Sequence, residues 1–127
     1  MVKFHPGFNP EVIDWLVDRG YRGIALEGTG LGHVGQRCFK SVGRAVEEGL
    51  TVTMTSQCLW GRVNMKVYRN GILLLKLGVI ALEDMLPETA LVKLMWALGQ
   101  TGDRDEVIEL LKTNIAHEFS PRTLYSP

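Results

Sequence analysis

The chain has 127 residues and carries fourteen basic and fourteen acidic side chains. This length fits one domain around a single core, and a hydrophobic content of 46% is ordinary for a globular protein. The zero formal charge argues against nucleic-acid binding through an overall field, although it leaves room for a local basic patch. The apolar run 71–82 is interrupted by Lys76 and is shorter than the roughly 20 residues that a membrane-spanning helix needs.

The chain opens with a predicted strand, a helix and a second strand. Residues 2–4 have strand character, so the chain begins abruptly, and we expect a second or excised domain of a longer protein. Asn9 and Pro10 are typical of a helix start, and Gly20 ends the apolar residues that follow at helical spacing. The apolar residues 23–27, bounded by glycines, predict the second strand.

The same alternation continues through the middle of the chain. A helix is predicted over 34–48, ending at Gly49, and a strand over 50–54. A further helix over about 65–77 and a strand over 79–82 follow.

Two more helices are expected before the end of the chain. The first is introduced by residues 83–88 and runs through Leu98, and its buried stripe is formed by Leu91, Leu94, Met95 and Leu98. Trp96 is also expected to lie in the core. Asp103 is predicted to cap the second, and the tail from His117 should be irregular.

Strands separated by single helices predict right-handed crossovers and a parallel sheet covered on both faces. We therefore predict an α/β fold: a three-layer, four-stranded parallel sheet flanked by helices, flavodoxin-like or Rossmann-like, in one domain spanning residues 1–127.

Polar residues gather where the predicted strands end. The turns 5–7, 28–35 and 55–65 leave the carboxyl ends of the first three strands, which is where such sheets bind ligands. Buried loops hold polar groups only if these groups bond one another or face a ligand. For Ser56, Gln57 and Asn64 both interpretations, loop scaffolding and ligand contact, stay open.

Gly30, Gly32 and Gly35 form a G-x-G-x-x-G motif between a strand and a helix, which is the setting of a dinucleotide fingerprint. A nucleotide-binding oxidoreductase domain is therefore an alternative. However, the acid expected at the end of the next strand is replaced by Thr-Met-Thr-Ser, residues 53–56. A tight turn that lets a second chain or a small substrate approach its amides suits the same glycines.

The histidines and cysteines predict neither a metal site nor any other cofactor. The possible ligands lack the spacing of a zinc site; they are His5, His33, Cys38, Cys58 and His117. Cys58 is expected to be a packed thiol, because no histidine or assigned helix start lies beside it. Two unlike cysteines without a secretory signal favour a reduced, cytoplasmic setting.

Four stretches, "EGTGLGH", "TSQCLWGRVNM", "GVIALEDMLPETALVKLMWALGQT" and "NIAHEF", are similar to the carboxyl-terminal domain of the type I L-asparaginase family. Within that family the chain most resembles the D subunit of archaeal glutamyl-tRNA(Gln) amidotransferases. The resemblance covers nearly the whole chain. It implies a domain of an amidohydrolase that releases ammonia from glutamine or asparagine, which the E subunit then uses to convert glutamate on tRNA(Gln) into glutamine.

The resemblance also implies that this chain alone is inactive. The nucleophilic threonine of the family and its activating Asp/Lys pair lie in an amino-terminal catalytic domain, in motifs that this sequence lacks. Amide hydrolysis requires a nucleophile, a base and oxyanion donors held together. The expected partners are that catalytic domain, a second copy in a homodimer, the amidotransferase E subunit, and tRNA only indirectly. The preference between glutamine and asparagine rests largely on the absent domain.

Carried over by position, the resemblance implies a substrate-binding role for two residues. His33 stands where asparaginases usually present an asparagine to the neighbouring subunit, and Asn64 stands near an acid that faces the substrate amine in some members. Histidine can be charged and Asn64 offers no full charge, so both positions depart from the pattern. Gly30, Gly32, Ser56 and Gln57 would support the pocket. A purely structural assembly domain remains the non-enzymatic alternative.

Overall fold

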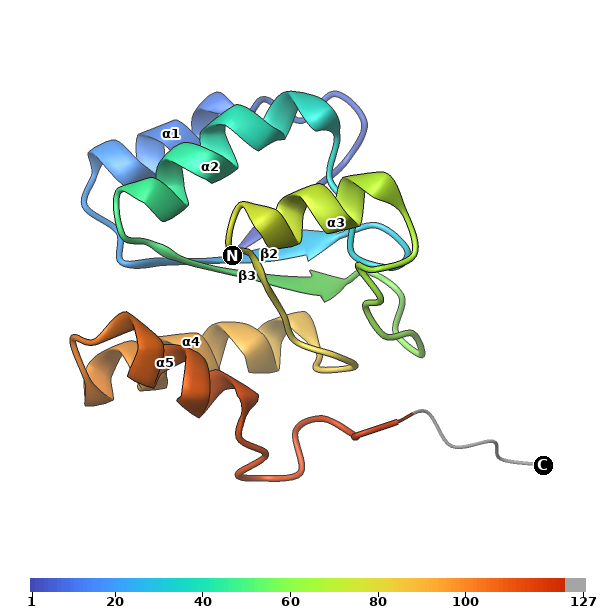
Figure 1. Cartoon of the computed structure of the whole chain (residues 1–127), viewed down its shortest axis with the longest axis vertical. Coiled ribbons are helices and arrows are strands. Elements are labelled where there is room, and N and C mark those ends of the chain that lie inside the picture. The colour runs from blue at the N-terminus through green and yellow to red at the C-terminus, as the bar shows by residue number, and fades with distance from the viewer. Residues whose placement is uncertain (123–127) are drawn as a thin grey trace.

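The computed structural model describes residues 1–122. Four strands alternate with helices along the chain, and two helices follow the last strand (Figure 1). In chain order, the elements are β1 (Val2–Lys3), α1 (Glu11–Asp18), β2 (Gly23–Gly28), a 3-10 turn (Gln36–Cys38), α2 (Phe39–Glu47), β3 (Thr51–Ser56), α3 (Arg69–Lys76), β4 (Ile80–Ala81), α4 (Pro87–Gln100) and α5 (Arg104–Lys112).

The strands form one parallel sheet in the order β1-β2-β3-β4. The central pair, β2 and β3, is in register over six residues, from Gly23 opposite Thr51 to Gly28 opposite Ser56. The predicted four-stranded parallel sheet is therefore confirmed.

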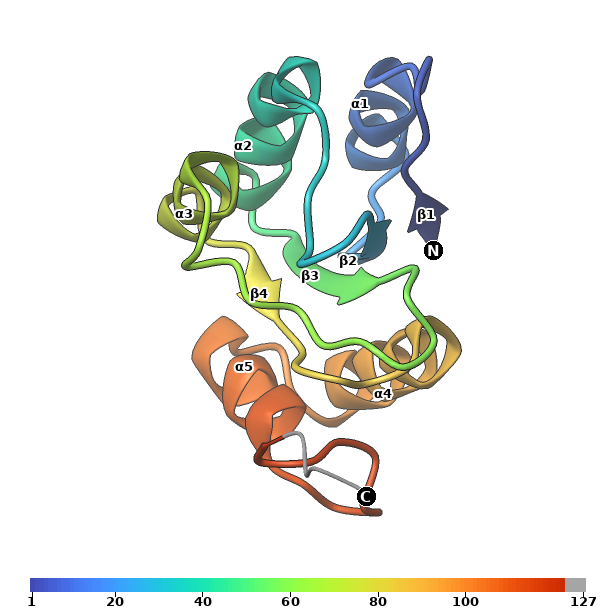
Figure 2. The same cartoon turned by 90° about the vertical axis from the view of Figure 1, so that its right-hand side faces the viewer.

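Helices cover both faces of this sheet, so the predicted three-layer arrangement is also confirmed. The helices α1, α2 and α3 lie on one face, and α4 and α5 lie on the other (Figure 2). Each of the first three helices connects one strand to the next strand in the sheet. Crossovers of one hand that always step in the same direction place their helices on the same face, so the opposite face is left for the two helices after β4.

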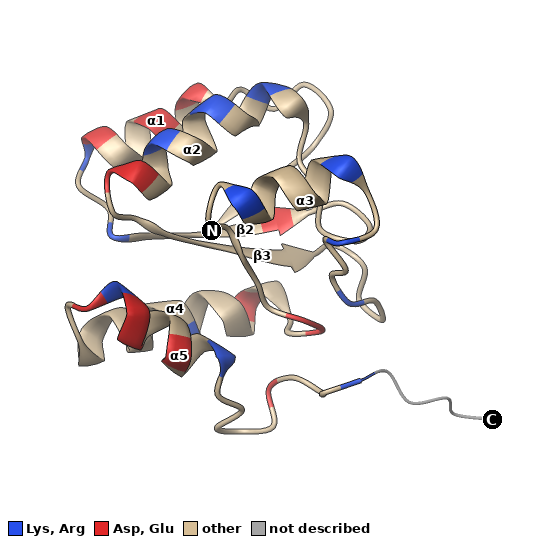
Figure 3. Ribbon diagram, viewed as in Figure 1, with Lys and Arg blue, Asp and Glu red and all other residues tan. Residues whose placement is uncertain are grey.

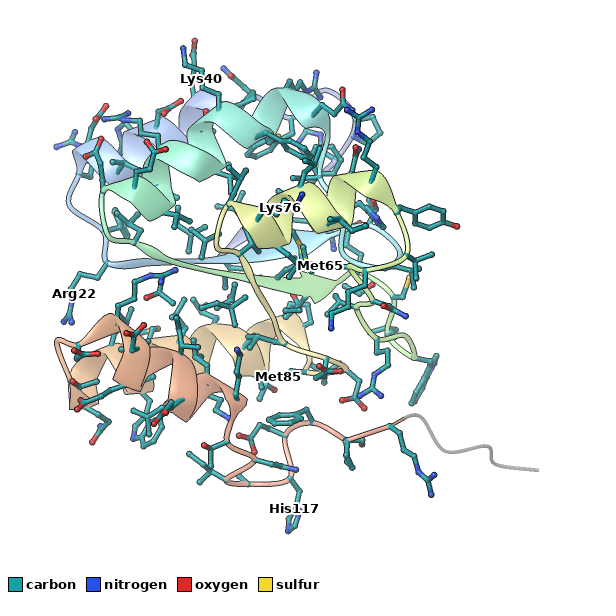
Figure 4. All side chains as sticks on the ribbon, in the orientation of Figure 1. Arg22, Lys40, Met65, Lys76, Met85 and His117 are labelled. Carbon is teal, nitrogen blue, oxygen red and sulfur yellow. The ribbon has the colours of Figure 1, made fainter. Side chains whose placement is uncertain are left out.

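Two apolar clusters hold the layers together, one on each face. Met65 belongs to the cluster under α1, α2 and α3, and Met85 belongs to the cluster over α4 and α5 (Figure 4). Alternation along β2 supplies both clusters, because Ile24 and Leu26 enter the first and Ala25 enters the second.

Most predicted elements occur, with shifted ends. The helix predicted from residue 34 begins with the 3-10 turn, and the helix predicted from residue 65 begins only at Arg69. Asp103 caps α5 as predicted, since its Oδ1 accepts the amides of Asp105 and Glu106 at 2.8 and 3.1 Å. The described part of the tail is irregular, while residues 123–127 lie outside the described residues.

The predicted buried stripe of α4 is partly wrong. Met95 is 65% exposed and Trp96 is 41% exposed, whereas Ala90, Leu94 and Ala97 are buried. The face against the sheet is centred on two alanines, because small side chains allow the helix to approach β2 closely. Leu94 and Leu98 pack against the position of Gly23, where a Cβ atom would lie 2.8 Å from Leu98 Cδ1.

Candidate functional site

The carboxyl edge of the sheet gathers the three polar segments that the sequence singled out. The turn after β2, residues 29–35, and the loop after β3, residues 57–68, leave this edge next to each other. A cavity of about 270 Å³ opens beside the start of the loop, and its lining includes Glu27, Ser56 and Gln57 but neither His33 nor Asn64.

Ser56 ties the two segments together. Its Oγ donates a 2.6 Å hydrogen bond to the carbonyl oxygen of Gly30 and accepts a 3.0 Å bond from the amide of Cys58. Because Ser56 is buried at the last position of β3, it fixes the glycine turn against the following loop.

Gln57 ties the edge to β1 and β2. Its Nε2 donates to the carbonyl oxygens of Phe4 at 2.5 Å and Glu27 at 3.1 Å. The side-chain amide therefore spans the ends of two neighbouring strands. Both Ser56 and Gln57 bond backbone atoms, so these hydrogen bonds fit the scaffolding interpretation.

The glycine turn is tight enough to require its glycines. Gly30 and Gly32 have φ values of +50° and +95°, which residues other than glycine rarely adopt. A Cβ atom on Gly32 would lie 2.9 Å from Val63 Cγ1. The turn therefore packs directly on the loop after β3, and Gly32 supports the shape of the edge.

His33 lies at the end of this turn with one ring nitrogen unsatisfied. It is half-buried, and its Nε2 is buried without a hydrogen-bond partner among residues 1–122. Its ring lies 5.5 Å from the ring of Tyr68, centroid to centroid. A buried polar atom without a partner is costly, so this nitrogen is an unsatisfied group at the edge.

Asn64 is exposed on the neighbouring loop. Its backbone amide donates to the carbonyl oxygen of Leu31 at 2.9 Å, which holds the loop against the turn that carries His33. The amide of Val63 donates to Glu83 at 2.8 Å and anchors the other side of the loop. The fold thus brings the segments of His33 and Asn64 together, with the Asn64 side chain open to solvent.

Sequence reasoning missed two residues at this edge. Glu27 is 7% exposed, and its Oε1 accepts a 2.9 Å bond from Lys3 Nζ. Arg62 lies near the carboxylates of Glu83 and Asp84, at 3.4 and 3.6 Å. An acid at the end of an apolar strand was the available signal for Glu27, whereas the partners of Arg62 are too distant in sequence to be read from a pattern.

Cys58 is exposed rather than packed, which corrects the expectation for that thiol. It lies in the turn after β3, outside the strand that would have buried it. Cys38 is buried, and this burial raises the pKa of its thiol, while nearby Arg37 acts in the opposite direction. Within residues 1–122, no three His, Cys, Asp or Glu side chains are placed to hold a metal ion, and no helix has the length and apolar character needed to span a membrane.

The geometry gives the nucleotide alternative little support. Open α/β sheets bind dinucleotides where the strand order reverses, and this sheet runs in sequence order without a reversal. The glycine turn leads into a 3-10 turn before α2, and the buried end of β3 is Ser56 where a ribose-binding acid would stand. The sheet therefore lacks the switch-point crevice in which such folds bind dinucleotides.

Known proteins similar to this chain are amidotransferase subunits and asparaginases. The D subunit of glutamyl-tRNA(Gln) amidotransferase from Methanopyrus kandleri is 63% identical over 119 residues, which are 94% of this chain and 26% of the relative. The corresponding D subunit from Pyrococcus abyssi is 57% identical over 125 residues, which are 98% of this chain and 28% of the relative. The chain thus spans about a quarter of the length of these relatives.

Two solved structures of asparaginases superpose closely on this chain. The thermostable L-asparaginase from Thermococcus kodakarensis superposes with a TM-score of 0.85 at 39% identity, covering 95% of this chain and 37% of the asparaginase. L-asparaginase I from Vibrio cholerae gives a TM-score of 0.84 at 32% identity, covering 94% and 36%. The family model of the glutaminase/asparaginase C-terminal domain matches residues 1–111. This chain therefore belongs to the glutaminase/asparaginase C-terminal domain family.

Proposed function

We propose that this chain is the subunit-packing and site-completing C-terminal domain of an amidohydrolase like the D subunit of glutamyl-tRNA(Gln) amidotransferase. The observation that carries the proposal is the 63% identity to such a D subunit over 94% of this chain, which spans only 26% of that relative. The remaining length of such a protein has room for a catalytic domain. The whole enzyme would release ammonia from glutamine or asparagine for the conversion of Glu-tRNA(Gln) to Gln-tRNA(Gln).

In this proposal the chain does not perform the chemistry itself. Its expected partners are an N-terminal catalytic domain, a second copy in a homodimer and the amidotransferase E subunit, with tRNA acting on it only indirectly. The two free cysteines in the described residues suit a reducing, cytoplasmic location.

His33 and Asn64 are the residues that we assign to substrate binding. The unsatisfied Nε2 of His33 and the exposed amide of Asn64 supply polar groups on adjoining segments of the edge. They would orient the substrate in the pocket of the neighbouring catalytic domain, with Gly30, Gly32, Ser56 and Gln57 holding both segments in place.

The test compares this chain alone with the assembled enzyme that includes the catalytic portion. This chain alone should release no ammonia from glutamine, whereas the assembled enzyme should. In that enzyme, His33→Ala and Asn64→Ala should raise the KM for glutamine about tenfold or more, the size expected from one lost hydrogen bond to a bound group. His33→Asn should retain activity, and His117→Ala, on the tail, is the control.

A KM that stays unchanged in both alanine variants, with assembly intact, would leave only the structural role. Ammonia release by this chain alone would overturn the proposal.

A type I L-asparaginase domain is the second candidate, supported by the 39% identity to the Thermococcus kodakarensis enzyme. The higher identity to the D subunits of the amidotransferases favours the amidotransferase. Ammonia release that is stimulated by Glu-tRNA(Gln) and the E subunit distinguishes the amidotransferase from a free-standing asparaginase.

A further inference from the structure

Positive charge is concentrated along one part of this neutral chain. Residues 28–46 contain three Lys or Arg side chains and no Asp or Glu, and residues 49–82 contain four and likewise no acid. The acids lie elsewhere, mainly on α1, the end of α2, the turn before α4, and α5 (Figure 3). Some basic side chains of the two stretches have partners, because Arg44 pairs with Asp14, Asp18 and Glu48, and Arg62 pairs with Glu83 and Asp84.

Three cations without such partners lie on segments at the carboxyl edge of the sheet. Arg37, Lys66 and Arg69 are exposed and form no ion pair with a carboxylate of the described residues. Gln36 Nε2 donates to Asn70 Oδ1 at 3.3 Å, and this bond holds the 3-10 turn, which contains Arg37, next to the start of α3, which contains Arg69. In Figure 3 three basic segments lie at the end of the sheet toward which the strand arrows point: the 3-10 turn, the start of α3 and the loop before α3.

Large apolar side chains stand exposed along the same segment. Trp60 is 98% exposed, Leu59 is 75%, Tyr68 is 59% and Val67 is 53%. Single exposed apolar residues are normal on a surface, but a group that includes a fully exposed tryptophan marks an interaction site. Trp, Tyr and Arg are also the residue types enriched at the energetic centres of protein interfaces.

We propose that these residues form a docking edge for an acidic protein surface on a neighbouring subunit, with an apolar pocket that receives Trp60. The docking edge is defined as Arg37, Trp60, Lys66, Tyr68 and Arg69. The inference rests on the proposed function, which places a neighbouring catalytic domain against the carboxyl edge, and it adds the chemistry of the partner surface.

The observations favour a protein over RNA as the partner. A protein that binds a nucleic-acid backbone commonly makes about 6 to 10 phosphate contacts, and this edge offers three free cations. An interface with a protein needs fewer charges, because the apolar anchors supply affinity while the cations set orientation and association rate.

The test measures the assembly of subunits of the complete enzyme, which contains both this chain and the catalytic portion, by analytical ultracentrifugation at several salt concentrations. Trp60→Ala should weaken assembly about thirtyfold or more. Trp96→Ala, at an exposed tryptophan on α4, is the matched control and should leave assembly unchanged. The high exposure of Trp60 means that its removal should not change the thermal unfolding of this chain.

Charge reversal tests whether the cations of the docking edge contribute to assembly. Arg69→Glu should slow association about tenfold at low salt and should remove most of the salt dependence. Lys76→Glu, at the exposed far end of the same helix, makes the same charge change away from the docking edge. Unchanged assembly in both Trp60→Ala and Arg69→Glu would overturn the docking edge. If Arg69→Glu assembles normally but binds a tRNA probe tenfold more weakly, the edge binds RNA and the proposal is likewise overturned.

This outcome is separable from a failure of the proposed function. Assembly affinity reports on the docking edge, whereas the KM for glutamine in the His33 and Asn64 variants reports on completion of the substrate site. An enzyme that loses assembly with Trp60→Ala but keeps its KM with His33→Ala and Asn64→Ala supports the docking edge and contradicts the site-completing role.

Discussion

Lys93 and Glu118 form an ion pair in which each side chain is only 7% exposed. Lys93 Nζ also donates to the carbonyl oxygen of Thr113 at 2.5 Å, and Glu118 accepts the amides of Ile115 and Ala116. The pair therefore fastens the tail after α5 to the middle of α4. The tail then reaches the candidate site, because the amide of Ser120 donates to Asp84 at 2.7 Å.

Replacing Lys93 by Met should destabilise the chain, since it leaves the Glu118 carboxylate without its cation in a buried position. We expect a loss of about 3 kcal/mol in the free energy of unfolding at neutral pH, typical of breaking one side of a buried pair. Urea denaturation measures this loss. Lys112→Met, at an exposed lysine, is the control, and equal stability of the two variants would show that the pair contributes nothing.

The same pair predicts a pH dependence of stability. Burial alone would raise the pKa of Glu118, but Lys93 and the amides of Glu118, Ala116 and Ile115 outweigh it and lower the pKa to about 2. Because the folded pKa lies below the ordinary value of 4.5, this contribution is complete above that value and is lost as pH falls toward 2. The stability difference between the native chain and Glu118→Gln should therefore shrink over this range in urea titrations. A constant difference would contradict the ion pair.

Two threonines of β3 should respond in opposite ways to replacement by valine, which has nearly the same shape. Thr53 is 0% exposed and its hydroxyl has no partner among the described residues, whereas the Thr55 hydroxyl donates to the carbonyl oxygen of Leu26 at 3.1 Å. Thr53→Val should raise the free energy of unfolding by about 1 kcal/mol, and Thr55→Val should lower it by about the same amount. Thermal and urea unfolding measure both, and a loss of stability in Thr53→Val would indicate that its hydroxyl is satisfied.

Gly32 and Gly49 separate backbone strain from steric overlap. Both have positive φ, +95° and +90°, but only Gly32 lies close to other side chains. Gly49→Ala should cost about 1 kcal/mol from backbone strain, and Gly32→Ala should cost a further 1 to 3 kcal/mol, roughly, because its Cβ overlaps Val63. Equal losses in the two variants would mean that the turn adjusts freely around Gly32.

The two cysteines should differ strongly in reactivity. Cys58 is exposed and Cys38 is buried, with its thiol pKa raised by that burial. Because the thiolate is the reactive form, an aromatic disulfide reagent should modify one thiol quickly under native conditions and the second only on unfolding. Cys58→Ser should remove the fast phase, and a fast phase that persists in this variant would contradict the burial of Cys38.

The sequence by itself determined the order and type of the elements. Apolar runs bounded by glycines located the strands, and the caps at Pro10 and Asp103 located two helix starts, because these signals depend on residues close together in the chain. The positions of three polar turns at one edge also followed, since the carboxyl ends of parallel strands meet there. Element ends were less accurate, as the late start of α3 at Arg69 shows.

Only the tertiary structure decided what each side chain at that edge and on α4 contacts. The face of α4 depends on close approach to the sheet, so Ala90 and Ala97 are buried while the more apolar Met95 is exposed. Ser56 and Gly30 are 26 positions apart in sequence, and Lys93 and Glu118 are 25 apart. Contacts over such separations depend on how whole helices and strands pack against each other, so a local pattern of residues does not predict them.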